Sequence, residues 1–138
     1  MPLVRIDVHS GRSQDELNSL SRGIHDAILA EYGIPERDYF HIVTEHAPGQ
    51  IVAQDAGLGF ERTRDVVMIQ IFTQAGRSQG AKQSLFAAVA EKLAALGVAG
   101  EDVFIGYVEN TAGDWSFGFG RAQYVTGELA VPKKYGRK

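Results

Sequence analysis

Apolar residues recur with two different periods along the first 110 residues of the chain. Short runs rich in β-branched residues predict strands over 3–8, 39–44, 66–72 and 103–108. Between the strands of each pair, apolar residues return every three or four positions, which predicts an amphipathic helix. The two stripes are Leu17, Leu20, Ile24, Ala27 and Ile28 in the first helix, and Leu85, Val89, Leu93 and Leu96 in the second. The predicted order is strand, helix, strand, repeated once.

Local signals bound both helices. Ser13 with Glu16 three residues later has the spacing of a capping box. Gly33 suits a left-handed helix end, and Pro35 prevents continuation. Ser78 and Gly97 are the corresponding start and stop signals of the second helix.

The two units also resemble each other in sequence. The tetrapeptide Gly11-Arg12-Ser13-Gln14 recurs 65 positions later as Gly76-Arg77-Ser78-Gln79, and Gly33-Ile34 with Asp38 and Phe40 recurs 64 positions later as Gly97-Val98 with Asp102 and Phe104. We interpret 2–45 and 66–109 as two copies of one strand-helix-strand unit.

Each such unit pairs its strands in parallel through a right-handed crossover. Two units predict an α/β (α+β) fold, with a four-stranded sheet and both helices on one face. The strands are apolar enough that the other face should be covered too, which predicts self-association. We expect one domain over 1–131, followed by a basic, flexible tail over 132–138.

Composition narrows the function classes. The absence of cysteine excludes disulfides and thiolate chemistry, and a net charge of -3 disfavours a dedicated nucleic-acid partner. No apolar run suits a membrane span, and the N-terminus is not typical of a signal peptide, so we expect a cytoplasmic protein. His9, His25, His41 and His46 lack paired metal spacing, and no phosphate-binding loop is present. We therefore expect no metal and no cofactor.

Three residues are candidates for chemistry. Removal of Met1 would leave Pro2 with a free secondary amine, which can act as acid, base or iminium-forming nucleophile. Asp38 precedes the second strand, so it should share a sheet edge with Pro2. Arg77 follows the third strand and reaches that edge if the units run antiparallel. Arg12 and Asp102 should gather at the opposite end.

Specific motifs lie outside the strand and helix pattern. They are the run His46 to Gly49, Asp55 to Gly59, and above all the aromatic segment Asp114 to Ala122, followed by Thr126 to Leu129. Met1-Pro2-Leu3, Gly11-Arg12, Gly33 to Asp38 and Val108 to Asn110 are further motifs within or beside the predicted elements. With Pro2 opening a strand and Arg77 following the third, the chain resembles the tautomerase superfamily and, within it, the malonate semialdehyde decarboxylases.

The resemblance implies a homotrimer that decarboxylates a small carboxylate substrate without a cofactor. It implies Pro2 and Asp38 as catalytic residues and Arg77 as the substrate anchor, with an apolar wall made of Trp115, Phe117, Tyr124 and Leu129. The Arg-Pro-Arg run of the family reads Gln74-Ala75-Gly76-Arg77 here. Gln74 is therefore expected to help orient the substrate carboxylate through a neutral hydrogen bond.

Two alternatives stay open at this point. One is another reaction of the same proline, tautomerisation or hydration of an enol or unsaturated acid, which the neutral Gln74 favours. The other is a non-catalytic trimeric protein that binds small molecules. The related chloroacrylate dehalogenases fit less well, since their helix histidine, tyrosine and glutamate correspond to Leu29, Phe104 and Trp115.

Overall fold

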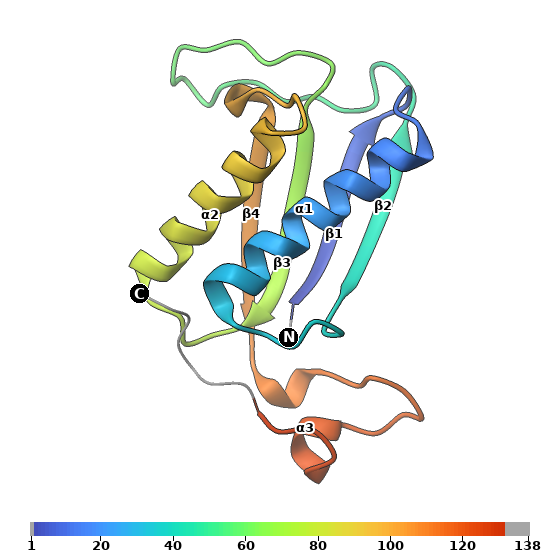
Figure 1. Cartoon of the computed structure of the whole chain (residues 1–138), viewed down its shortest axis with the longest axis vertical. Helices are drawn as coiled ribbons and strands as arrows, with labels where there is room; N and C mark the ends of the chain where they lie inside the picture. Colours follow the sequence, from blue (N-terminus) through green and yellow to red (C-terminus); the bar gives the residue numbers. More distant parts are fainter. Residues whose placement is uncertain (1, 132–138) are drawn as a thin grey trace.

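The computed structural model describes residues 2–131, which form a four-stranded sheet with two long helices on one face (Figure 1). The elements are β1 (Pro2–His9), α1 (Gln14–Tyr32), β2 (Phe40–His46), β3 (Val67–Gln74), α2 (Gln79–Ala94) and β4 (Val103–Asn110), with short helical turns at Gly100–Asp102, Ala112–Asp114 and α3 (Gln123–Thr126). The predicted tail over 132–138 lies outside the described residues.

The sheet order is β2-β1-β3-β4. Within each unit the strands are parallel, with Leu3 opposite Phe40 and Gln74 opposite Asn110. The units meet through β1 and β3, which are antiparallel with Pro2 opposite Thr73. The predicted duplication and sheet are thus confirmed. Because β1 and β3 are antiparallel, the start of β1 lies beside the end of β3 at one end of the sheet.

The helix signals act largely as the sequence predicts. Ser13 and Glu16 form a reciprocal capping box, and Gly33 ends α1 in the left-handed conformation with φ of 62°. Ser78 caps α2 by accepting from the backbone N–H of Ala81. The prediction for Gly97 is inexact, because α2 ends at Ala94 and Gly97 adopts φ of 89° in the turn that follows.

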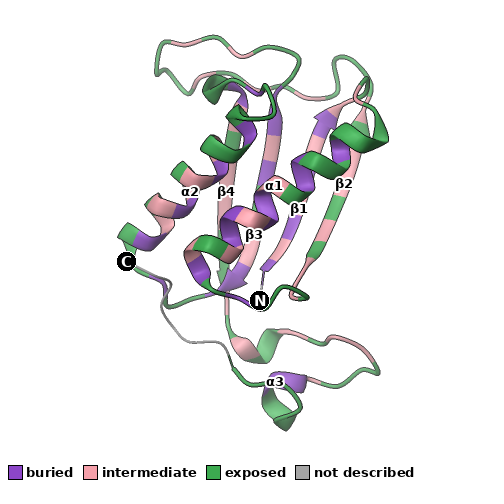
Figure 2. Cartoon of the chain, in the orientation of Figure 1, coloured by how far each residue is buried: buried purple, intermediate pink, exposed green. Residues whose placement is uncertain are grey.

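The core lies between the helices and the inner face of the sheet (Figure 2). Alternate strand residues such as Val4, Ile6, Ile69 and Ile71 are fully buried against the two helix stripes. Each buried aliphatic side chain stabilises the fold by about 1.5–3 kcal/mol, so this layer fixes the strand register.

Residues 2–131 leave the outer face of the sheet uncovered. Phe40, Ile42, Phe104 and Val108 remain 42–44% exposed on the two outer strands. An apolar sheet face of this kind fits the expected self-association.

Long segments extend from both ends of the sheet (Figure 1). The connection over 47–66 covers one end, and 111–131 lies beyond the other, where β1 begins. None of the helices in the described part of the chain has the length and hydropathy to cross a bilayer.

Candidate active site

Pro2 and Arg77 meet through Thr73. Pro2 is buried at the start of β1, opposite Thr73 on the neighbouring strand. The Nη1 atom of Arg77 donates to the Thr73 hydroxyl at 3.1 Å. The structure therefore brings Pro2 and Arg77 to the same end of the sheet, as the sequence predicts.

The Arg77 guanidinium is buried, with only 6% of the residue exposed. Its plane lies over the Tyr32 ring, 4.1 Å from the ring centroid, and Nη1 also contacts the Gln74 carbonyl at 3.4 Å. Among the described residues its hydrogen bonds reach only neutral acceptors, and the buried Nε has no partner. A buried cation with unused donors is suited to an anionic group.

Asp38 lies in the turn that leads into β2. Its backbone N–H donates to the Pro35 carbonyl at 3.0 Å, which closes the turn. Burial raises the pKa of the Asp38 carboxyl, and nearby positive charges that include Arg77 oppose the rise. Asp38 and Arg77 are therefore close enough to interact electrostatically.

Tyr124 joins this group from the C-terminal segment. Burial, followed by the negative charge of Asp38, raises the pKa of Tyr124 to about 12, while Arg77 acts in the opposite direction. The phenol is thus neutral at physiological pH and able to donate a hydrogen bond.

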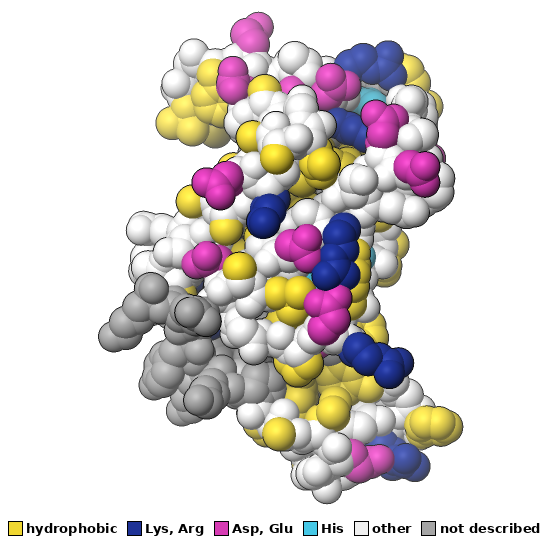
Figure 3. All heavy atoms as spheres, viewed as in Figure 1, with side chains coloured by type: hydrophobic (Ala, Val, Ile, Leu, Met, Phe, Trp, Pro, Cys, Tyr) yellow, Lys and Arg dark blue, Asp and Glu magenta, His cyan; other side chains and the backbone are white. Residues whose placement is uncertain are grey.

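The aromatic side chains of the same segment form one cluster. The Phe117 ring lies 5.2 Å from Tyr124, 6.4 Å from Trp115 and 5.9 Å from Phe40, measured between centroids. Trp115 is tied to the end of β4, because its Nε1 donates to Asn110 Oδ1 at 2.8 Å. Apolar side chains accordingly gather between the body of the protein and this segment (Figure 3).

Gln74 and Leu129, two further residues predicted for the site, are described only by their burial and backbone position. Gln74 is buried at the end of β3, with 4% of the residue exposed, next to the fully buried Thr73. Leu129 is 42% exposed and is tied to the segment by a backbone hydrogen bond to Gln123. The roles of both side chains at the site stay predictions.

Two supporting residues were not predicted from the sequence. Tyr32 lies under Arg77, and the Gln123 amide holds the aromatic segment by accepting from the Phe117 backbone N–H and donating to the Gly118 carbonyl. Tyr32 continues the apolar stripe of α1 at helical spacing, which was an available signal. Nothing local in the sequence distinguishes Gln123 from a surface residue.

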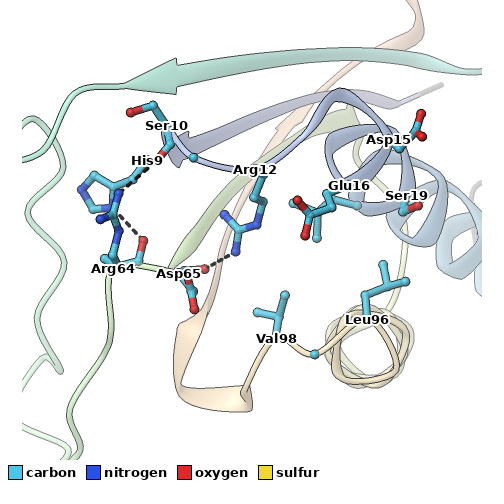
Figure 4. Close-up of a pocket in the computed structure, with 13 residues that line it drawn as sticks. His9, Ser10, Arg12, Asp15, Glu16, Ser19, Arg64, Asp65, Leu96 and Val98 are labelled. Carbon is cyan, nitrogen blue, oxygen red and sulfur yellow. Dashed lines mark hydrogen bonds between the residues drawn. The ribbon is translucent and has the colours of Figure 1, made fainter.

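A separate hollow of about 580 Å³ lies at the opposite end of the sheet (Figure 4). Arg12 lines it together with Asp15, Glu16, Arg64 and Asp65, and its Nη2 donates to the Asp65 carbonyl at 2.7 Å. Asp102, the repeat equivalent of Asp38, accepts there from the backbone N–H and hydroxyl of Thr63. Charges of both signs line this hollow, and Arg12 is already bonded to a backbone carbonyl. We therefore assign the candidate site to the Pro2 end.

The described residues contain no group of three His, Asp or Glu side chains arranged to hold a metal ion. The chemistry available at the Pro2 end is that of the proline, a carboxyl group, a guanidinium and a phenol.

A family model described as "Tautomerase enzyme" matches residues 38–118, and a second with the same description matches 2–61. The chain belongs to this tautomerase family. A curated relative, "Probable tautomerase YrdN" of Bacillus subtilis (strain 168), is 38% identical over 130 residues, which cover 94% of this chain and 100% of the relative.

Two solved structures are similar over nearly the whole chain. FG41 malonate semialdehyde decarboxylase inhibited by 3-bromopropiolate is 55% identical, with a TM-score of 0.92 and coverage of 94% of this chain and 99% of that one. A malonate semialdehyde decarboxylase described with decarboxylase and hydratase activities is 34% identical, with a TM-score of 0.89 and coverage of 93% and 99%. The predicted family resemblance is confirmed.

Proposed function

We propose that the protein decarboxylates malonate semialdehyde (3-oxopropanoate) to acetaldehyde and CO2. The observation that carries the proposal is the buried Arg77 guanidinium, with an unpartnered Nε among the described residues, beside the strand pair of Pro2 and Thr73. The 55% identity to a malonate semialdehyde decarboxylase supports the choice of substrate.

In the proposed reaction Arg77 binds the substrate carboxylate, and the Gln74 carbonyl helps to hold the guanidinium. The bond between the carboxylate carbon and C2 breaks, CO2 leaves, and the electron pair forms an enolate on the aldehyde. The Pro2 ammonium stabilises the developing oxyanion and supplies a proton, and the enol then becomes acetaldehyde.

Asp38 favours the charged form of Pro2 in this scheme. A carboxylate about 4 Å from an ammonium attracts it by roughly 4 kcal/mol at an effective dielectric of 20. Burial raises the pKa of Asp38, and the nearby positive charges limit this rise. The general-acid route is therefore favoured over an iminium, which needs a neutral amine.

The aromatic cluster is proposed to exclude water from the departing CO2. Trp115, Phe117 and Tyr124 form its core, and Leu129 belongs to the same segment. Desolvation of the carboxylate favours its conversion to an apolar product.

A homotrimer is the proposed assembly. The exposed apolar side chains on β2 and β4 would be buried by neighbouring copies, as in the family that the sequence resembles. Sedimentation or light scattering that gave a monomer at micromolar concentration would contradict this assembly.

Hydration or tautomerisation of related acids is the second candidate. Gln74 stands where the decarboxylase run has arginine, and a curated relative is named a probable tautomerase. The neutral Gln74 side chain binds a carboxylate more weakly than arginine would, and this widens the range of acids that the site accepts.

Proton NMR of malonate semialdehyde with the purified protein tests the first proposal, after mass spectrometry has established that Met1 is removed. We expect enzyme-dependent formation of acetaldehyde. An unchanged substrate spectrum, together with turnover of an enol or acetylenic acid, would favour the second candidate instead.

A further inference from the structure

His25 is a fully buried histidine for which the sequence gives no role. It projects from α1 and is 0% exposed. Its Nε2 lies 2.9 Å from the Glu36 carbonyl oxygen, and its ring stacks on Tyr39 with centroids 3.8 Å apart and planes 19° from parallel. Buried imidazoles with two such specific contacts orient what they touch.

These two contacts lie on either side of Asp38. Glu36 is two residues before it and Tyr39 one residue after it. The turn between them is closed only by one backbone bond, from Asp38 to Pro35 at 3.0 Å, among the backbone bonds of the described chain. The imidazole therefore contacts the turn on both sides of Asp38, the candidate catalytic carboxyl.

The direction of the hydrogen bond between His25 and Glu36 follows from the chemistry of the two groups. A carbonyl oxygen can only accept, so His25 Nε2 carries the proton and donates it to Glu36. The Nδ1 atom is buried and has no hydrogen-bond partner among residues 2–131. One directional bond and one ring stack thus define the orientation of the side chain.

The duplication supplies an internal comparison. The 65-residue offset that relates Leu20 to Leu85 and Ile24 to Val89 places Ala90 at the position of His25. The second unit therefore has no imidazole there, and its Asp102 is held instead by Thr63. Of the two equivalent turns, the imidazole supports the one at the Pro2 end.

We propose that His25 is a positioning residue for the reaction proposed above: its bond to Glu36 and its stack on Tyr39 fix the turn that aims the Asp38 carboxyl at the Pro2 end. The inference rests on the proposed function for its kinetic consequence, and on geometry alone for its effect on Asp38.

Other polar groups surround the imidazole, and a substitution of His25 will affect them as well. Tyr39, just before β2, and His41, in β2, both pack against the imidazole. Ser21 of α1 forms hydrogen bonds with both of these side chains. At the surface, Arg22 forms ion pairs with Asp26 and Glu36. The carboxyl of Asp38 itself interacts electrostatically with His25.

Two substitutions separate the bond from the ring. His25→Gln keeps a side-chain N–H near the position of Nε2 and removes the stack, whereas His25→Phe keeps a ring over Tyr39 and removes the donor. His41→Phe is the matched control, since His41 packs on Tyr39 but bonds Ser21 rather than the turn.

We expect His25→Phe to lower kcat roughly tenfold, because small displacements of a catalytic group cost rate, with KM changed by less than about twofold. His25→Gln should recover most of kcat, and His41→Phe should leave it unchanged. Equal losses in His25→Phe and His41→Phe, or no recovery in His25→Gln, would overturn the proposal.

Carbon-13 NMR of the Asp38 carboxyl gives a readout that needs no turnover. Its signal is assigned by its loss in Asp38→Asn, and its titration midpoint should move in His25→Phe and return in His25→Gln. An unmoved midpoint in His25→Phe refutes the role of His25 even if decarboxylation is observed. Conversely, the expected titration in a protein that leaves malonate semialdehyde unchanged refutes the proposed reaction and retains the role of His25.

Discussion

Tyr124 and Asp38 interact although they lie 86 positions apart, and the charge of Asp38 adds to burial in raising the pKa of Tyr124 to about 12. This electrostatic interaction links the C-terminal aromatic segment to the turn before β2. Arg77, which acts on both groups, completes a set drawn from three separate parts of the chain.

Pro2→Ala should lower decarboxylation by at least about 100-fold, the usual contribution of a positioned general acid. Alanine keeps a free amine after removal of Met1, but loses the secondary amine and its ring. Because Pro2 is buried opposite Thr73, the variant should be checked by circular dichroism. Full activity in a folded variant would refute the proline mechanism.

Arg77→Met should lower kcat/KM by about 10- to 100-fold, the cost of one charge-assisted hydrogen bond, mainly through KM. Methionine retains an unbranched apolar stem over Tyr32, which limits the loss of packing. Arg12→Met is the matched control, because Arg12 is the repeat equivalent of Arg77 and its guanidinium bonds the Asp65 carbonyl. A larger effect at Arg12 would move the site to the opposite end of the sheet.

Asp38→Asn should reduce turnover without loss of thermal stability near neutral pH. The folded-state pKa of Asp38 is raised, so its contribution to stability is greatest when the carboxyl is protonated and is lost as pH rises through that pKa. An uncharged amide removes this cost at neutral pH. A marked fall in melting temperature, measured by calorimetry at neutral pH, would contradict this account.

The stability of the protein should fall on acidification between the ordinary and the shifted pKa of His41. Burial, with a further contribution from the charge of His25, lowers the pKa of His41 from 6.5 to about 4. Between these values the unfolded chain binds a proton that the folded protein does not, so stability present above 6.5 is lost as pH falls. His41→Phe should show a flatter dependence of melting temperature on pH in this window.

Phe117→Ala should reduce kcat/KM and loosen the aromatic segment, because Phe117 contacts Phe40, Trp115 and Tyr124. Phe119→Ala is the control: Phe119 belongs to the same segment, is 90% exposed and has a ring contact only with Arg121 among the described residues. Similar losses in both variants would show that the segment as a whole, rather than the cluster, is responsible.

Much of the fold follows from local sequence signals. The periodicities, the capping residues and the repeated Gly-Arg-Ser-Gln motif predict two strand-helix-strand units, and the parallel crossover then predicts the sheet. The meeting of Pro2 and Arg77 follows from the same logic, once the units are taken to be antiparallel. The predicted strand ends were short by two residues in β2, β3 and β4, because neighbouring strands extend the pairing beyond the apolar run.

The sequence alone therefore determined the architecture, the family and the end of the sheet at which Pro2, Asp38 and Arg77 gather. Only the tertiary structure showed that Tyr32 lies under Arg77 and that His25 bonds the turn before Asp38. Periodicity reports which residues are buried, since burial depends on one face of one element. Which buried side chains touch depends on rotamers and on elements far apart in the chain, and these are decided only when the helices pack on the sheet.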